Sequence, residues 1–371
     1  MITPTHTPYV VAEPLQLLYL EGDGIGPEIT AATIRVLQAA DALWRLNFRF
    51  ESASIGLTAL KTDGTTFPET VFNRAKSADG VVLGPVSHNE YPPVAEGGLN
   101  PSGELRKRLD LFANIRPART RPGTDFASRT SFDLVIVREN TEGFYADRSM
   151  FLGPGEYMPT PDLALSTRKV TREACMRIAR EGFRLAAMRG GKVTAVHKAN
   201  VLRISDGLFL EATRSVSRDF PGILYEEQLV DAMAALLVRN AGAFDVIITT
   251  NMFGDILSDE ASELAGGLGL GASLNAGTEY AVAQAQHGSA PTLAGQDLAN
   301  PSSLIASSAM LLTWLSARHG REDLAIAARR IEIALDRAIE NPESRTRDLG
   351  GSLGTKAFTD RVIQNLQLVT E

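Results

Sequence analysis

Short apolar runs alternate with longer amphipathic segments along the whole chain. The apolar runs are rich in Val, Ile and Leu and predict buried strands at residues 15–20, 80–83, 132–137, 192–196 and 244–250. After an opening helix that ends near residue 44, helical periodicity predicts further helices at residues 105–111, 171–189, 206–218, 231–240, 251–262 and 301–319. Strands that alternate with helices predict an α/β protein with a largely parallel sheet.

Composition narrows the class of protein. The 371 residues exceed what one hydrophobic core usually serves, so we expect two lobes. A net charge of −7, with Lys and Arg scattered along the chain, argues against binding to nucleic acid or to an anionic membrane. The single cysteine, Cys175, excludes an intrachain disulfide and is expected to be buried in a helix. Without a membrane-spanning run or a secretory signal, we expect a cytoplasmic enzyme.

Two acidic residues follow the apolar strand at residues 244–250. Asp255 and Asp259 are four residues apart, so a helix places both carboxylates on one face. Such a pair is often no more than two solvated acids. It also suits a hard divalent cation such as Mg²⁺ or Mn²⁺, which prefers oxygen ligands. The position after a buried strand favours the metal, because open α/β sheets bind ligands there.

A glycine-rich segment, residues 22–28, follows the first strand. It resembles a dinucleotide-binding loop, but its third glycine comes one position too early for the GxGxxG pattern. A tight turn between strand and helix explains it at least as well.

Charged residues follow three of the predicted strands: Arg138, Lys198 and Asp255. Isolated charges at such positions are usually solvated. If the three strand ends come together, with Arg106 and Arg116 nearby, they form a pocket for a substrate with several negative charges. No order of Ser, His and Asp, no Cys–His pair and no zinc-ligand spacing is present.

Six segments carry a resemblance to a known family: residues 22–28, 105–119, 138–145, 197–202, 251–262 and 287–291. In this order they resemble the metal-dependent β-decarboxylating dehydrogenases, the isocitrate/isopropylmalate dehydrogenase family. The family also includes homoisocitrate and tartrate dehydrogenases. The stretch Asn-Met-Phe-Gly-Asp-Ile-Leu-Ser-Asp, with His-Gly-Ser-Ala-Pro downstream, is the most specific part. Within the family, the resemblance is nearest to the 3-isopropylmalate branch.

The resemblance implies a two-lobed α/β fold that is not a Rossmann fold, with a sheet running through both lobes. Residues 1–111 and 267–371 would form the first, cofactor-side lobe, and residues 112–266 the second. An arm at about residues 147–169 would clasp a second subunit. The active site would lie between the lobes and be completed by the partner in a homodimer, although a tetramer stays open.

The resemblance also assigns roles to single residues. Substrate would be bound by Arg106, Arg116, Arg138, Ser102 and Asn200. The metal would be held by Asp255, Asp259 and a partner's Asp231. Proton transfer would be carried out by a partner's Lys198 and by Tyr145. Without the resemblance, Tyr145 is more simply interpreted as a packed aromatic side chain. The cofactor would contact His287, Gly288, Ser289, Ala290, Pro291 and Asn300.

The implied reaction is the NAD-dependent oxidative decarboxylation of a 3-substituted malate with Mg²⁺ or Mn²⁺. We expect 3-isopropylmalate as substrate and 2-oxo-4-methylpentanoate as product, and hence a place in leucine biosynthesis. D-Malate, tartrate, isocitrate and homoisocitrate stay open as alternatives. An inactive regulatory subunit is a further alternative, which the joint presence of Lys198, Tyr145, the arginines and the aspartates opposes.

Four departures from the family pattern bear on specificity. Ser102 and Gly103 stand where isopropylmalate enzymes usually have leucines, so the substituent pocket looks less apolar. The segment 284–288 has Gln-Ala-Gln-His-Gly where Glu-Pro-Val-His-Gly is common. Thr292 replaces the Asp of NAD enzymes and no NADP-type Lys-Tyr pair is present, which favours NAD while leaving NADP open through Arg347. The sequence Gly-Phe-Tyr-Ala-Asp at residues 143–147 closely matches neither the isopropylmalate nor the isocitrate enzymes.

Overall fold

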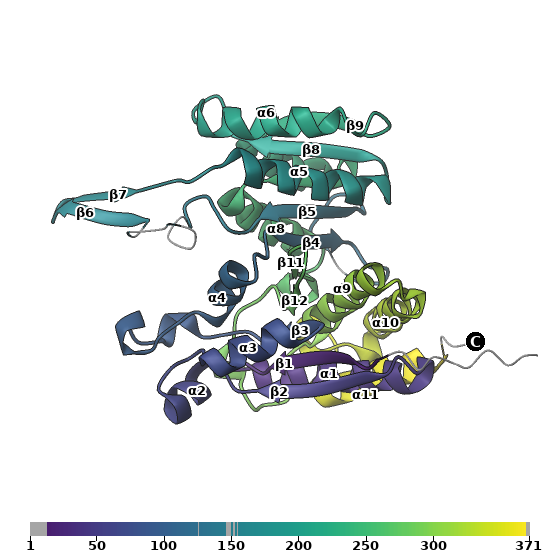
Figure 1. The fold of residues 1–371 in the computed structure, drawn as a ribbon. Helices are drawn as coiled ribbons and strands as arrows, with labels where there is room; N and C mark the ends of the chain where they lie inside the picture. Colours follow the sequence, from purple (N-terminus) through teal and green to yellow (C-terminus); the bar gives the residue numbers. More distant parts are fainter. Residues whose placement is uncertain (1–12, 125, 146–149, 151–152, 154, 369–371) are drawn as a thin grey trace, which may run out of the picture.

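The computed structural model describes residues 13–124, 126–145, 150, 153 and 155–368. A ten-stranded sheet runs through the molecule in the order β2-β1-β3-β12-β11-β4-β5-β10-β8-β9 (Figure 1). Its strands are β1 Leu15–Leu20, β2 Phe48–Ala53, β3 Gly80–Leu83, β4 Ala113–Arg119, β5 Asp133–Glu139, β8 Lys192–His197, β9 Leu224–Leu229, β10 Val246–Thr249, β11 Leu274–Ala276 and β12 Ala281–Gln284. The expectation of one sheet through both halves is confirmed.

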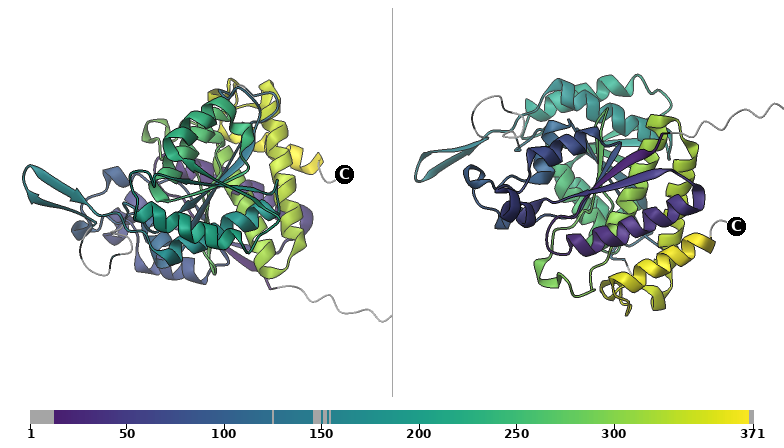
Figure 2. Two further views of the ribbon diagram at one scale, coloured as in Figure 1. Left: turned by 90° about the horizontal axis from the view of Figure 1, so that it is seen from above. Right: turned by 60° about the horizontal axis from the view of Figure 1, so that its bottom comes forward.

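Helices fill most of the remaining chain. They are α1 Gly26–Trp44, α2 Gly56–Asp63, α3 Glu69–Ser77, α4 Pro101–Arg108, α5 Arg172–Ala187, α6 Ser205–Ser217, α7 Val230–Asn240, α8 Asn251–Leu264, α9 Ser302–His319, α10 Glu322–Glu340 and α11 Thr355–Leu368. Seen from above, the strands fan out about a common centre and the helices surround them (Figure 2). None of the described helices is long and apolar enough to cross a membrane.

The sheet consists of two parallel blocks joined by two antiparallel strands. β2, β1, β3 and β12 form one block, and β5, β10, β8 and β9 form the other. Between them, β11 and β4 pair antiparallel with each other and with both flanking strands. The expected largely parallel sheet is therefore confirmed, and its antiparallel pairings are confined to the centre.

Successive side chains of each strand point to opposite faces of the sheet. One face forms a single continuous hydrophobic core with its helices, and the other face forms two separate cores. On one face, the whole sheet packs against α1, α5, α6, α9, α10 and α11. On the other face, α3 and α4 cover the β1 block, while α7 and α8 cover the β5 block. In β5, Val135 and Val137 belong to the continuous core, and Leu134 and Ile136 to the core under α8.

The two cores on that second face do not meet. Between them the same face carries polar residues of the central strands, namely Asn114, Arg116, Arg138, Asn275 and Gln284. Four of these side chains are buried and Gln284 is partly buried. We call this set the polar gap.

Local signals explain where the predicted helices begin. Thr171 caps α5 as expected, because its hydroxyl accepts a hydrogen bond from Ala174 N. The helix predicted at residues 105–111 was placed wrongly: α4 begins at Pro101, because the Asn100 side chain accepts from Gly103 N and caps it.

A hairpin protrudes from the body of the molecule at the predicted arm. Strands β6 (Glu156–Thr160) and β7 (Leu163–Ser166) pair antiparallel, and all their residues are exposed (Figure 1). The predicted arm also includes residues 147–149, 151, 152 and 154, which lie outside the described residues. A hairpin without a core of its own suits a contact with another molecule.

Candidate active site

The polar gap borders a cavity of about 330 Å³. The expected site residues Ser102, Arg106, Arg116, Arg138, Tyr145, Asp255, His287 and Gly288 line this cavity. The strand register explains the gathering, because Asn114 of β4 lies directly between Arg138 of β5 and Asn275 of β11.

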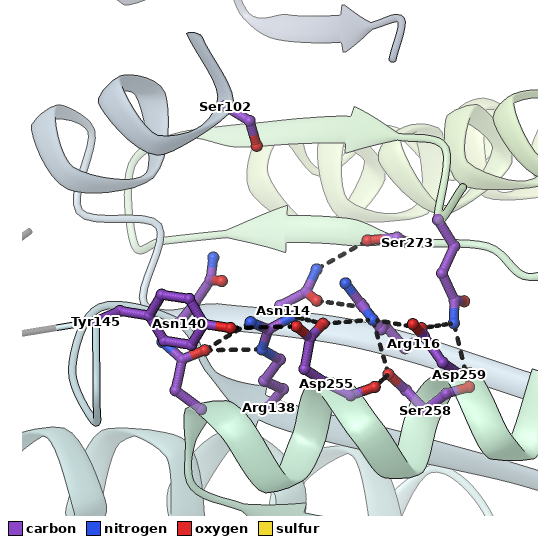
Figure 3. Close-up of polar contacts among 12 residues, drawn as sticks. Ser102, Asn114, Arg116, Arg138, Asn140, Tyr145, Asp255, Ser258, Asp259 and Ser273 are labelled. Carbon is purple, nitrogen blue, oxygen red and sulfur yellow. Dashed lines mark hydrogen bonds and ion pairs between the residues drawn. The ribbon is translucent and has the colours of Figure 1, made fainter. Parts of the chain in front are cut away.

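Arg116 lies between the two aspartates of α8 (Figure 3). Its Nη1 atom is 3.1 Å from Asp255 Oδ1 and 3.1 Å from Asp259 Oδ1, and it donates to Ser258 Oγ at 2.8 Å. Its Nε atom donates to Asn114 Oδ1 at 2.6 Å. The helix therefore does turn both carboxylates toward one positive group.

Arg138 is held by the first turn of the same helix. Its Nε and Nη2 atoms donate to Asn251 Oδ1 at 2.9 and 2.7 Å, and Nη1 contacts Asp255 Oδ1. The Tyr145 hydroxyl donates to Asp255 Oδ2 at 3.4 Å. Burial would raise the pKa of Asp255, but the charges of Arg138 and of the other two cavity arginines outweigh it and hold this pKa below its usual value.

Gln284 joins the opposite wall of the cavity to the sheet. Its Oε1 atom accepts from Ser102 Oγ at 2.9 Å, from Asn275 Nδ2 at 3.2 Å and from Arg106 Nη2 at 3.3 Å. This wall is polar where a leucine-lined pocket would be apolar, as the Ser102 position suggested. A neutral amide oxygen here accepts from Arg106 without neutralising its charge.

Lys198 lies apart from these groups. Its Nζ atom donates to Asp231 Oδ1 at 2.5 Å, which lowers the pKa of that carboxyl, and Asn200 is exposed in the same turn. Neither Lys198 nor Asp231 lines the cavity. The expected meeting of three strand ends therefore holds for Arg138 and Asp255 but is wrong for Lys198 within one chain, where Lys198 turns to Asp231 at the start of α7.

The donor set fits a divalent cation in part. Asp255 and Asp259 each direct an oxygen to the same nitrogen of Arg116, so the two carboxylates already converge on a cation. Among the described residues, no group of three His, Cys, Asp or Glu side chains is arranged to hold a metal ion. Within the described part of one chain, two carboxylates thus converge on one cationic group.

Protein atoms, not open space, surround the glycine-rich turn after β1. A Cβ atom at Gly22 would lie 2.1 Å from Pro85 O, and one at Gly24 would lie 2.0 Å from Ser289 O. Both glycines have positive φ, and Ile25 N donates to Ser289 O at 2.8 Å. The tight-turn interpretation is favoured over a dinucleotide fingerprint, and this turn supports the loop at 287–291.

The expected cofactor residues lie on the loop after β12. The His287 ring contacts Gly288 O at 3.0 Å, and burial lowers the pKa of this histidine. Pro291 opens a short 3₁₀ helix. Asn300 donates to Asp348 Oδ2 at 2.9 Å and accepts from Ser302 N at 2.9 Å.

A family model described as isocitrate/isopropylmalate dehydrogenase matches residues 16–364. The chain belongs to this family. It is therefore a dehydrogenase, as the resemblance implied. The fold of this dehydrogenase agrees with a solved relative, an isocitrate dehydrogenase from Methylococcus capsulatus, with a TM-score of 0.83, 38% identity, and 95% and 99% of the two chains covered.

Sequence relatives of this dehydrogenase differ in their substrates. It is 40% identical to an isocitrate/homoisocitrate dehydrogenase of Thermus thermophilus, over 95% of this chain and 98% of the relative. It is 37% identical to a 3-isopropylmalate dehydrogenase of Sulfurisphaera tokodaii, over 94% and 98%. The family is shared, while the named substrates are not.

Several residues of this site were not identified from the sequence. Asn114, Asn275 and Gln286 were not assigned to the site, and Gln284 was noted only as a lost carboxylate. A signal was present for Asn114: in β4, polar side chains at 114 and 116 alternate with the apolar Ala113 and Ile115, which is typical of a strand with one polar face.

Proposed function

We propose that this dehydrogenase oxidises a 3-substituted malate at C2 and removes its β-carboxylate as CO₂, with NAD⁺ as hydride acceptor and Mg²⁺ or Mn²⁺ as metal. The main support is the cavity in which Arg106, Arg116 and Arg138 lie around Asp255. Three guanidinium groups suit the carboxylates of a malate, because Arg binds a carboxylate through two parallel hydrogen bonds.

The metal would be held by Asp255 and Asp259 together with Asp231 of the partner subunit. When bound, a divalent ion polarises the oxygen on C2. The convergence of both α8 carboxylates on Arg116 supports this assignment.

Lys198 of the partner subunit would take the proton from the C2 hydroxyl. A hydride would pass from C2 to the nicotinamide, which removes two electrons and leaves a ketone. The bond between C3 and its carboxylate would then break, and the electron pair left on C3 would be protonated through the Tyr145 hydroxyl, which lies at the cavity wall.

Exposed apolar side chains near Lys198 support a homodimer with shared sites. Ile204 is 90% exposed, Val201 66% and Ile256 on α8 59%. A second copy covering these side chains would remove them from water and bring its own Lys198 and Asp231 to this cavity. The β6–β7 hairpin would add to the contact, and the division into residues 1–111 with 267–371 and 112–266 would place the cavity between two lobes.

The nucleotide would bind along the loop at residues 287–291 and at Asn300. NAD⁺ is the proposed form, since Thr292 and Leu293 offer no positive charge to a 2′-phosphate. Arg347 is exposed nearby in sequence to Asp348, the partner of Asn300, and is the residue through which NADP⁺ would be accepted.

The 3-substituent of the malate has two candidates. The hydrogen bond between Ser102 and Gln284 favours a polar substituent that carries a carboxylate, as in isocitrate or homoisocitrate. The 3-isopropylmalate expected from the sequence is the second, supported by relatives named for it.

Initial rates of NADH formation with Mn²⁺ test the substrate directly. The panel holds D-malate, tartrate, isocitrate, homoisocitrate and 3-isopropylmalate, each with NAD⁺ and with NADP⁺. A tenfold lead in kcat/KM, about 1.4 kcal/mol of transition-state preference, for a tricarboxylate supports the polar pocket. An equal lead for 3-isopropylmalate contradicts it.

Mixed dimers test the shared site. Lys198→Ala and Asp255→Asn homodimers are each expected to be inactive. If Lys198 acts in the partner's cavity, random mixing of the two variants restores about a quarter of wild-type activity, because half of the dimers then contain one intact site of two. No restored activity in proven mixed dimers would place Lys198 in its own chain's site.

A further inference from the structure

Gln286 connects the cofactor-side loop to an aspartate of α8. Its Nε2 atom donates to Asp259 Oδ1 at 3.0 Å and to Ser258 O at 3.1 Å. Its Oε1 atom accepts from Ser262 Oγ at 3.2 Å. One side chain thus spans from the strand-β12 exit, next to His287, to three residues of the helix that carries both carboxylates.

The surrounding backbone is shaped to hold this side chain. A Cβ atom at position 271 would lie 2.4 Å from Gln286 Oε1 and 2.9 Å from Ser262 Oγ, so Gly271 leaves the space that the amide occupies. The backbone N of Gln286 donates to Ser303 Oγ at 3.1 Å, at the start of α9. Both ends of the glutamine are therefore fixed.

The bridge leaves half of the carboxylate available. Asp259 Oδ1 accepts from both Arg116 Nη1 and Gln286 Nε2, and contacts from the described residues reach only this oxygen. The side chain remains 49% exposed. With Oδ1 held from two sides, Oδ2 has a fixed direction in which to meet a cation, and partners of this kind raise the affinity of metal ligands.

We propose that Gln286 is a positioning residue that couples nucleotide binding to divalent-metal binding. The inference rests on the proposed function, in which the loop at 287–291 holds the nucleotide and Asp259 the metal. A nucleotide that binds the loop in this conformation favours the contact of Gln286 with Asp259, and so tightens metal binding. By linkage, the metal tightens nucleotide binding by the same factor.

Mn²⁺ binding to the full-length protein tests this inference without a turnover assay. The Kd of Mn²⁺ is measured by electron paramagnetic resonance with and without saturating NAD⁺, and the ratio of the two values is the coupling factor. We expect roughly a 5–150-fold ratio in the wild-type protein, the usual range for coupled sites. In Gln286→Met, which keeps the length but loses the amide, the ratio is expected to fall to about 1.

Two further variants separate coupling from general damage. Ser262→Ala removes one contact of the bridge and is expected to lower the ratio part of the way. Gln296→Met is the matched control, because the side chain of this exposed glutamine on the same connection donates to Thr292 O at 2.6 Å and not to α8, and its ratio is expected to stay at the wild-type value.

The outcomes divide cleanly. A wild-type ratio of about 1, or a Gln286→Met ratio equal to that of the wild type, overturns the coupling. Failure of the metal assignment is recognised separately, because Asp255→Asn and Asp259→Asn would then bind Mn²⁺ as tightly as the wild type does.

Discussion

Two arrangements of arginine and aspartate in this dehydrogenase differ in what they leave open. Beside the cavity, Asp255 and Asp259 are 34% and 49% exposed although Arg116 and Arg138 are buried. At the N-terminal end of α8, Arg168 pairs with an Asp206 that is 0% exposed, at 2.5 Å. Both arrangements are charged, but only the first keeps carboxylate oxygens accessible.

The Arg168–Asp206 pair is saturated by its neighbours. Arg168 also donates to Ser205 Oγ at 2.8 Å and to Thr250 Oγ1 at 3.0 Å. Asp206 Oδ2 accepts from Lys198 N at 2.6 Å. The pair thus ties the turn that carries Lys198 to the start of α8, whereas the cavity cluster holds more positive than negative groups. The buried pair has the features of a structural contact, and the surplus positive charge of the cavity is consistent with the anionic substrate proposed above.

The largest expected effect comes from breaking the buried pair. Arg168→Met leaves Asp206 buried without its cation and is expected to lower the free energy of unfolding by about 3–5 kcal/mol. Urea denaturation measures the loss. The double variant with Asp206→Leu is expected to recover part of it, because no lone charge stays buried; a single variant as stable as the wild type would remove the structural role.

Removing an arginine from the cavity is expected to reduce activity and to leave stability unchanged. Arg106→Met is expected to lower kcat/KM roughly tenfold to a hundredfold, the 1.5–3 kcal/mol of a hydrogen bond to a charged group. Its melting temperature is expected to stay near that of the wild type. Arg318→Met, on an exposed arginine paired with Glu279, is the control for general loss of charge. A large drop in stability with unchanged kinetics would reverse the comparison.

The Cys175 thiol interacts with Arg168 of the buried pair, and its ionisation is expected to have a smaller effect on stability. Burial, together with the charges of Glu142 and Glu139 and against that of Arg168, raises the pKa of its thiol to about 12. Because this pKa lies above the value of about 8.5 in an unfolded chain, the stabilisation is present below pH 8.5 and is lost as pH rises. From pH 8.5 to 10 we expect a loss of roughly 1–2 kcal/mol.

Denaturation at several pH values measures this loss, with Cys175→Ala as the matched variant. The decline should be shallower in Cys175→Ala, and the native wild-type thiol should resist labelling at pH 8. Rapid labelling would mean that the region around Arg168 is open to water.

Local sequence signals predicted the parts of this molecule whose partners lie near in sequence. The strand at 15–20 and the helix bearing Asp255 follow from periodicity alone. The nineteen-residue helix α10, Glu322–Glu340, was overlooked although it is strongly amphipathic. The three-residue β11 carries too few residues for any period.

The same distinction between partners that are near and distant in sequence applies to the candidate site. The convergence of Arg138 and Asp255 follows from adjacent parallel strands. The contact of Ser102 on α4 with Gln284 at the end of β12 joins residues 182 positions apart, which no local pattern encodes. The argument from strand ends alone placed Lys198 in the cavity of its own chain. It failed because the position of β8 within the sheet depends on the complete topology.

The pairing of β3 with β12 has a consequence for how the chain is made. Val81 lies beside Val282, so β3 leaves the ribosome about 200 residues before its neighbour exists. At about 5–20 residues per second, that edge waits roughly 10–40 s. β5, β8 and β10 meet their partners much sooner. Until β12 arrives, the apolar edge of β3 is open to pairing with other nascent chains, so we expect this strand to be a point at which the unfinished chain aggregates.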